Sequence, residues 1–259
     1  MRRLLVGMIY ALSGGLGILA FLYPFFMPHV VADAGSFQSQ LAPLLTAVLV
    51  GLAVLALFLE VQGQTLSAKT VALMGVLVAV TSVLRFIEVA IPLPGGFSPI
   101  FAPIIIAGYA FGPRFGFLMG ALTLLTSALI TGGIGPWLPF QMFTAGWAGL
   151  TAGWLPHPNK RWTLPMLCLF GFVWGVLYGV IINLYFWPFM QGPATQSWAQ
   201  GLGLKNTLAR YAAFYVVTSL LWDLARAAGN VALLLLLTTP MLKVLERFRR
   251  RFHFEVDRG

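Results

Sequence analysis

The sequence predicts an all-α membrane protein, a polytopic bundle of transmembrane helices. Hydrophobic residues make up 59% of the 259-residue chain and charged residues only 9%, and the mean hydropathy is +0.88. A soluble domain of this length needs far more polar surface. The apolar stretches are long and unbroken, which favours helices over the ten-residue alternating strands of a β-barrel.

The apolar stretches divide into eight expected spans, since a helix needs about 20 residues to cross the hydrocarbon core. The first apolar run is longer than the core of an ordinary signal peptide, so we expect a retained anchor. The fourth and fifth spans are short and flank the sequence FGPRFG, where we expect a pair of short helices rather than one broken helix. The expected spans are 4–27, 40–60, 68–90, 98–111, 114–131, 137–155, 164–187 and 211–240.

The distribution of basic residues predicts the orientation of the chain. Lys and Arg total 16, and most of them fall on one side if the N-terminus is inside. This positive-inside bias places both termini in the cytoplasm. The basic tail KVLERFRRRFHFEVDRG favours contact with anionic lipid headgroups, and we expect no nucleic-acid partner. The exceptions to the bias are Arg85, Lys205, Arg210 and Arg226.

Motifs for catalysis are missing from the sequence. There is no GxxxxGK[ST] loop, so the chain does not hydrolyse ATP through a P-loop. The three histidines, His29, His157 and His253, fall in loops or in the tail, whereas an intramembrane metalloenzyme needs ligands clustered on helices. Cys168 lies in an apolar helix, where it is expected to act as a small hydrophobic residue. We therefore expect no catalytic residues and no metal site.

Two pairs of charged residues lie within expected spans, where charges are costly and often functional. Arg85 and Glu88 are spaced i,i+3, as are Asp223 and Arg226. Each pair could neutralise itself and fix helix packing, or it could face a cavity and contact a polar ligand. The second reading is stronger for Arg85 and Glu88, because the Pro- and Gly-rich segment 91–99 follows them and resembles a mobile lid. Asp223 and Arg226 lie deeper, where packing is favoured.

Other candidate binding residues gather in the same outer half of the molecule. The stretch TGGIGPWLPFQMF (131–143) reads either as a plain turn or as the rim of a pocket. Gln141 and Asn183 need hydrogen-bond partners, either each other or a ligand, while tryptophans and tyrosines at these depths could be interface anchors. The expected substrate-binding residues are Arg85, Glu88, Phe97, Trp137, Gln141, Asn183, Tyr185, Tyr211 and Tyr215.

A row of small residues runs along the third expected span. Ala68, Ala72, Gly75 and Ala79 are spaced so that they fall near one helix face, where small side chains let another helix approach closely. The row could serve internal packing or a partner protein.

The run FSPIFAPIIIAGYAFGPRFGFLMG (97–120) resembles the S components, the substrate-binding subunits, of energy-coupling factor (ECF) transporters. In that family a short helix ends in an FGPxxG-type turn, and an AxxxA-type stripe on the first core helix docks on the transmembrane T subunit. By position the docking stripe is Ala68, Ala72, Gly75 and Ala79. The resemblance covers about 68–243 and implies a six-helix core within 63–259. Residues 1–62 would then add two transmembrane helices to that core.

The resemblance also implies a function in the bacterial cell membrane. An S component is not an enzyme: it captures a vitamin with high affinity and associates with a T subunit and two ABC ATPases, which alone use ATP. It holds no permanent cofactor. The aromatic residues and the long segment 191–210 suggest a large planar ligand, with cobalamin or another corrinoid preferred over riboflavin and thiamine precursors. An intramembrane enzyme acting on lipid-like substrates and a scaffold without ligand remain alternatives.

Overall fold

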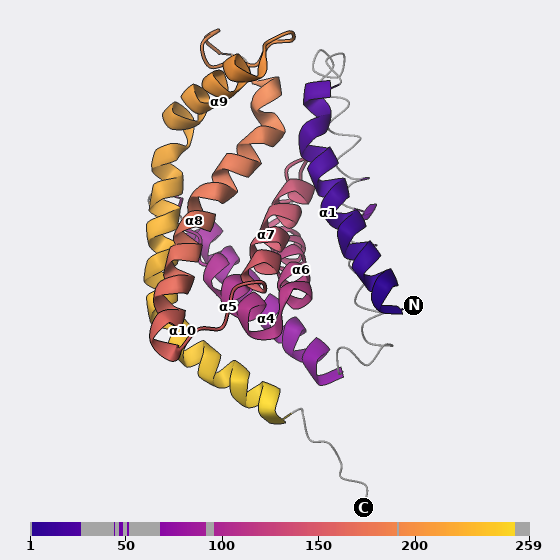
Figure 1. Cartoon of the computed structure of the whole chain (residues 1–259), viewed down its shortest axis with the longest axis vertical. Coiled ribbons are helices and arrows are strands. Elements are labelled where there is room, and N and C mark those ends of the chain that lie inside the picture. Colours follow the sequence, from indigo (N-terminus) through magenta and orange to yellow (C-terminus); the bar gives the residue numbers. More distant parts are fainter. Residues whose placement is uncertain are drawn as a thin grey trace, which may run out of the picture.

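A computed structural model confirms that the chain is an all-helical bundle (Figure 1). The structure describes residues 2–26, 44, 47–48, 51, 68–91, 96–190 and 192–251. Four of its helices are long and apolar enough to cross a membrane, and shorter apolar helices lie at Gly7–Leu22 and Phe101–Phe111. The candidate spans are Lys69–Ala90, Pro113–Thr131, Lys160–Phe189 and Leu220–Phe248.

Most of the expected spans in the described ranges coincide with helices. The expected span at 40–60 and the domain boundary at 62 lie outside the described residues, apart from a few isolated positions. The helices are α1 (Arg2–Phe26), α4 (Ala68–Ala90), α5 (Phe101–Phe111), α6 (Pro113–Thr131), α7 (Leu138–Ala152), α8 (Lys160–Phe186), the 3-10 helix η2 (Trp187–Phe189), α9 (Leu204–Thr218) and α10 (Leu220–Arg251).

The FGPRFG sequence forms the expected turn between two short helices. Gly112 has a φ of 94°, a conformation that favours glycine, and Pro113 begins α6 at a position where its missing N–H costs nothing. The glycines around this turn allow the backbones of α5, α6 and α7 to touch. A Cβ on Gly116 would overlap the carbonyl of Gly149, and a Cβ on Gly149 would overlap the carbonyl of Gly116. Phe115 and Gly116 of the motif are buried, whereas residues 111–114 are partly exposed.

A second set of glycines brings α8 and α10 together. Gly171, Gly175 and Gly179 follow one another at intervals of four residues, so they form one face of α8. A Cβ on any of them would collide with α10. Polar side chains of α10 donate hydrogen bonds to carbonyls of this face: Asn230 Nδ2 to Gly171 at 3.0 Å and Arg226 Nη1 to Gly175 at 3.4 Å.

The expectation of one continuous span at 211–240 is wrong. The chain breaks at Ser219, which has φ −132° and ψ −27°, and the break separates α9 from α10. In Figure 1, α9 runs obliquely across one end of the bundle and α10 returns along its side. Asn183 Nδ2 on α8 donates a hydrogen bond to Ser219 Oγ at 2.8 Å, which fixes the break by a tertiary contact.

The first helix is packed against the rest of the bundle. Phe21 of α1 contacts the ring of Phe140 edge-on at 5.0 Å between centroids and also lies against Trp147. Gly17 gives the space for this contact, because a Cβ there would overlap the rings of Phe143 and Trp147. Residues ahead of the expected six-helix core therefore contribute aromatic contacts to α7.

Candidate functional site

The first charged pair lies at the end of α4 beside the segment that enters α5. Arg85 Nη1 is 3.8 Å from Glu88 Oε1, and the two side chains are 21% and 20% exposed. Ser98 Oγ donates a hydrogen bond to Glu88 Oε2 at 2.8 Å. Glu88 therefore ties the described end of the segment 91–99 to α4, while residues 92–95 of the expected lid lie outside the described residues.

The second charged pair is more deeply buried. Arg226 donates a hydrogen bond to Asp223 Oδ1, and Asp223 is 2% exposed. Within the described part of the chain, Asp223 Oδ2 and the hydroxyl of Tyr215 have no hydrogen-bond partner of acceptable geometry, although the two groups lie close enough to interact. A buried carboxylate oxygen and a buried hydroxyl thus lie side by side without a hydrogen bond of normal geometry to any described residue.

The two charged pairs converge on Tyr178 of α8. The guanidinium carbon of Arg226 lies 5.2 Å from the centre of the Tyr178 ring, in the range of a cation–π contact. Arg85, Glu88 and Asp223 are also near enough to act electrostatically on Tyr178. Phe101 packs edge-on against the same ring at 4.7 Å.

An open cavity of about 190 Å³ lies next to this cluster. It lies between the second half of α8, the end of α9 and the start of α10, whereas Lys160 begins α8 and Lys243 belongs to the last third of α10. Its walls combine a carboxylate, a guanidinium, an amide, hydroxyls and aromatic rings, which suit a small polar ligand with a planar part. The lining residues are Tyr178, Gly179, Ile182, Asn183, Thr218, Ser219, Trp222, Asp223 and Arg226.

Some of the residues expected to bind substrate lie at or near this cavity. Asn183 lines it, and Tyr215 lies beside its carboxylate. Phe97 packs onto α10, because a Cβ on Gly229 would overlap its ring. Arg85 and Glu88 lie near Tyr178 but do not line the cavity.

Other expected residues lie elsewhere. Trp137 is 43% exposed, and its indole N–H donates to the carbonyl of Gly133 at 3.2 Å, so it is bonded to its own turn. Tyr185 stacks on Phe140 at 4.4 Å, and the Tyr211 hydroxyl donates to the carbonyl of Val180. Neither these residues nor Gln141 belong to the cavity walls. Their assignment to the ligand stays a prediction.

The sequence interpretation underrated the α8–α10 side of the site. Packing was favoured for Asp223 and Arg226; Arg226 does bond across to α8, and both residues also line the cavity. Tyr178, Trp222 and Gly179 were not considered. One sequence pattern could have identified this side of the site. Glycines spaced by four residues, at Gly171, Gly175 and Gly179, indicate a close helix–helix contact at the depth of Asp223.

The small-residue row on α4 faces outward. Ala72, Gly75 and Ala79 are exposed, and a Cβ on Gly75 would meet nothing within 4 Å. The side chain of Ala68 is outside the described part. Because these residues are exposed, the structure does not support internal packing as the role of the row. Docking on a partner protein stays a prediction.

These features define a multi-pass helical membrane protein with a polar cavity, and the described residues contain no cluster of metal-binding side chains. The chain belongs to the family described as "ECF transporter, substrate-specific component", whose model matches residues 69–238. It is therefore a transporter subunit rather than an enzyme. No curated protein and no solved structure matched the chain.

Proposed function

We propose that this subunit captures a small polar micronutrient in the cavity between α8, α9 and α10. The observation that carries the proposal is a buried carboxylate, Asp223, that lines an open cavity and has no hydrogen bond of normal geometry at Oδ2 within the described ranges, with the Tyr215 hydroxyl beside it. A buried polar group without a partner costs about 1–3 kcal/mol. A ligand that supplies a hydrogen-bond donor to Asp223 recovers this energy on binding.

The volume of the cavity supports a ligand of modest size. At about 190 Å³ it is smaller than the roughly 300–1,000 Å³ of pockets for drug-sized ligands. This favours the smaller ligands considered from the sequence, such as thiamine precursors, over cobalamin or riboflavin. The aromatic ring of Tyr178 beside the guanidinium of Arg226 offers a surface for a planar heterocycle.

The rest of the transport cycle follows from membership of the family. We propose that Ala72, Gly75 and Ala79, with Ala68, dock on a T subunit and that two ABC ATPases supply the energy. Their exposure on α4 supports this assignment, because small side chains let a partner helix approach closely. The positive-inside bias supports an orientation with both termini in the cytoplasm and the cavity toward the outside.

Equilibrium dialysis of the purified full chain tests the proposal. The panel comprises thiamine precursors, riboflavin and cobalamin. Each compound is tested against this chain alone, without the partner subunits. We expect one small ligand to bind and Asp223→Asn to weaken its binding at least tenfold. Asp257→Asn makes the same chemical change in the C-terminal tail and should bind like the parent chain. Tight binding of cobalamin would contradict the proposed ligand size, and unchanged binding by Asp223→Asn would contradict the proposed site.

A further inference from the structure

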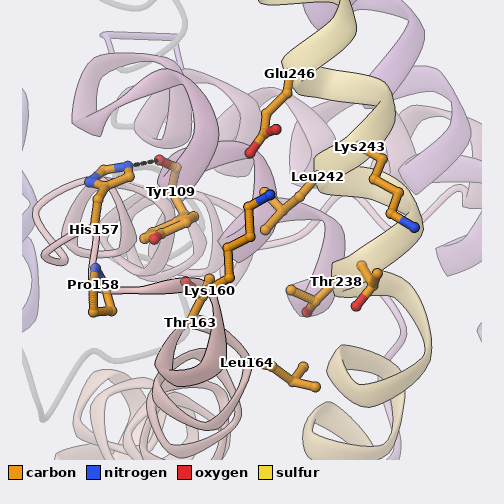
Figure 2. A pocket seen from close by; sticks show the side chains of 11 residues that line it. Tyr109, His157, Pro158, Lys160, Thr163, Leu164, Thr238, Leu242, Lys243 and Glu246 are labelled. Carbon is orange, nitrogen blue, oxygen red and sulfur yellow. Dashed lines mark hydrogen bonds between the residues drawn. The ribbon is translucent and has the colours of Figure 1, made fainter.

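A second cavity lies at the opposite end of α8 and α10 (Figure 2). Its volume is about 340 Å³, and its walls come from the end of α5, the start of α8 and the second half of α10. The candidate spans Lys160–Phe189 and Leu220–Phe248 begin and end here, so the cavity lies near the depth of lipid headgroups. It is separate from the cavity beside Asp223, and the capture of a micronutrient does not use it.

One wall of this cavity holds an unsatisfied hydroxyl. Thr238 is 2% exposed, and its Oγ1 has no hydrogen-bond partner among the described residues. A threonine in a helix commonly donates to the carbonyl four residues earlier. The following threonines make this bond here: Thr81, Thr131, Thr144, Thr151 and Thr218. Thr238 keeps its donor available at the cavity.

The two lysines of the cavity wall extend to opposite sides of α10 (Figure 2). Figure 2 shows the side chain of Lys160 extending between the start of α8 and α10. In the part of the chain that the structure describes, neither Lys160 nor Lys243 forms an ion pair. The start of α8 has no side-chain cap, so its first N–H groups and the positive end of its dipole favour an anion. Glu246 is the opposing charge in the wall.

The wall formed by the α7–α8 connection is held in place. His157 stacks on Tyr109 at 4.4 Å between ring centroids, and its Nε2–H donates to the carbonyl of Tyr109 at 3.2 Å (Figure 2). These two contacts fix the segment that leads into Lys160. The donors therefore sit on a structured wall rather than on a free loop.

We propose that this cavity binds a phosphate group, carried by an anionic phospholipid or free in solution, through Lys160, the first N–H groups of α8 and the hydroxyl of Thr238. Ammonium groups, hydroxyls and helix N-termini are the usual donors to phosphate oxygens. The position at the ends of two spans gives a phospholipid direct access from the bilayer.

Binding to the full chain in detergent tests this site. Phosphatidylglycerol is titrated by native mass spectrometry, and inorganic phosphate is titrated by thermal shift. Saturable binding of the lipid identifies a lipid site, and saturable stabilisation by inorganic phosphate alone identifies a site for the free ion. Either result supports the proposal if it depends on the residues below, and the absence of both overturns it.

Opposite charge changes supply the decisive comparison. Lys160→Gln should weaken binding about tenfold, because a charge-assisted hydrogen bond is lost. Glu246→Gln should strengthen it several-fold, because the opposing carboxylate is removed. Thr238→Val keeps the shape of the side chain and should weaken binding a few-fold. Arg161→Gln, next to Lys160 but outside the cavity walls, is the matched control.

Two results would overturn the proposal. One is an equal loss of binding in Arg161→Gln and Lys160→Gln, which would indicate attraction to general surface charge. The other is a loss of binding in Glu246→Gln, because a structural defect lowers binding whereas removal of a repulsive charge raises it. The measurements need neither a micronutrient nor ATP, so their outcome does not depend on the proposed function.

Discussion

Two tyrosines one helical turn apart on α9 are expected to play different roles, although the sequence suggested the same one. The hydroxyl of Tyr211 already donates to the carbonyl of Val180. The hydroxyl of Tyr215 has no hydrogen bond of normal geometry among the described residues and lies beside Asp223, which lines the cavity. The same change, Tyr to Phe, therefore removes a structural hydrogen bond at one position and an available donor at the other.

The expected magnitudes follow from these contacts. Tyr211→Phe should lower the free energy of unfolding by about 1 kcal/mol, because a net hydrogen bond is lost and a carbonyl loses its partner. This corresponds to a fall of about 2–4 °C in Tm for a chain of this size. Tyr215→Phe should leave Tm unchanged or slightly higher, and it should weaken ligand binding about 2- to 12-fold, the value of one hydrogen bond.

Thermal unfolding and equilibrium dialysis on the two purified variants measure both quantities. Tyr211→Phe serves as the matched control for Tyr215→Phe, since it removes the same atom from the same helix. If Tyr215→Phe lowers Tm as much as Tyr211→Phe does and leaves ligand affinity unchanged, the hydroxyl only supports the fold. The assignment of the unsatisfied groups to a ligand would then be refuted.

The remaining predictions concern packing, charge and docking. Gly149→Ala should lower the free energy of unfolding by about 2 kcal/mol in a thermal unfolding assay, because its Cβ would overlap a carbonyl of α6. Gly7→Ala is the control: its Cβ enters open space, so the free energy of unfolding should not change. Asp223→Asn should lower the free energy of unfolding by about 3 kcal/mol in the same assay, because it leaves the Arg226 guanidinium without its carboxylate partner. If the variant is as stable as the parent chain, solvent replaces the carboxylate. Ala72→Trp should block co-purification with a T subunit while ligand binding persists; loss of ligand binding would instead indicate that this face packs internally.

The bundle could be predicted from the sequence because lipid imposes strong constraints on helix length and composition. The span limits of α4, α5 and α6 and the turn at Gly112 follow from apolar runs and from a glycine–proline pair. The break at Ser219 could not be predicted in this way. No glycine or proline marks it, and a hydrogen bond from Asn183, far away in the sequence, supports it.

The candidate site was only partly predictable for a related reason. The i,i+3 spacing identified each charged pair, and both pairs are present. Their convergence on Tyr178 depends on how α4, α8 and α10 are rotated about their axes, which local spacing does not determine. Trp137 was expected at a pocket rim, and its N–H is satisfied within its own turn, so a role in binding stays a prediction.

The affinity of the isolated chain for its micronutrient, measured for the parent and for Gly179→Ala, tests the central claim most directly. A Cβ on Gly179 would occupy the position of the Asp223 carboxylate and reduce the cavity. We predict that the parent binds one small ligand of the panel with 1:1 stoichiometry and that Gly179→Ala loses this binding, while Gly7→Ala keeps it. Equal affinity of the parent and Gly179→Ala would contradict the account.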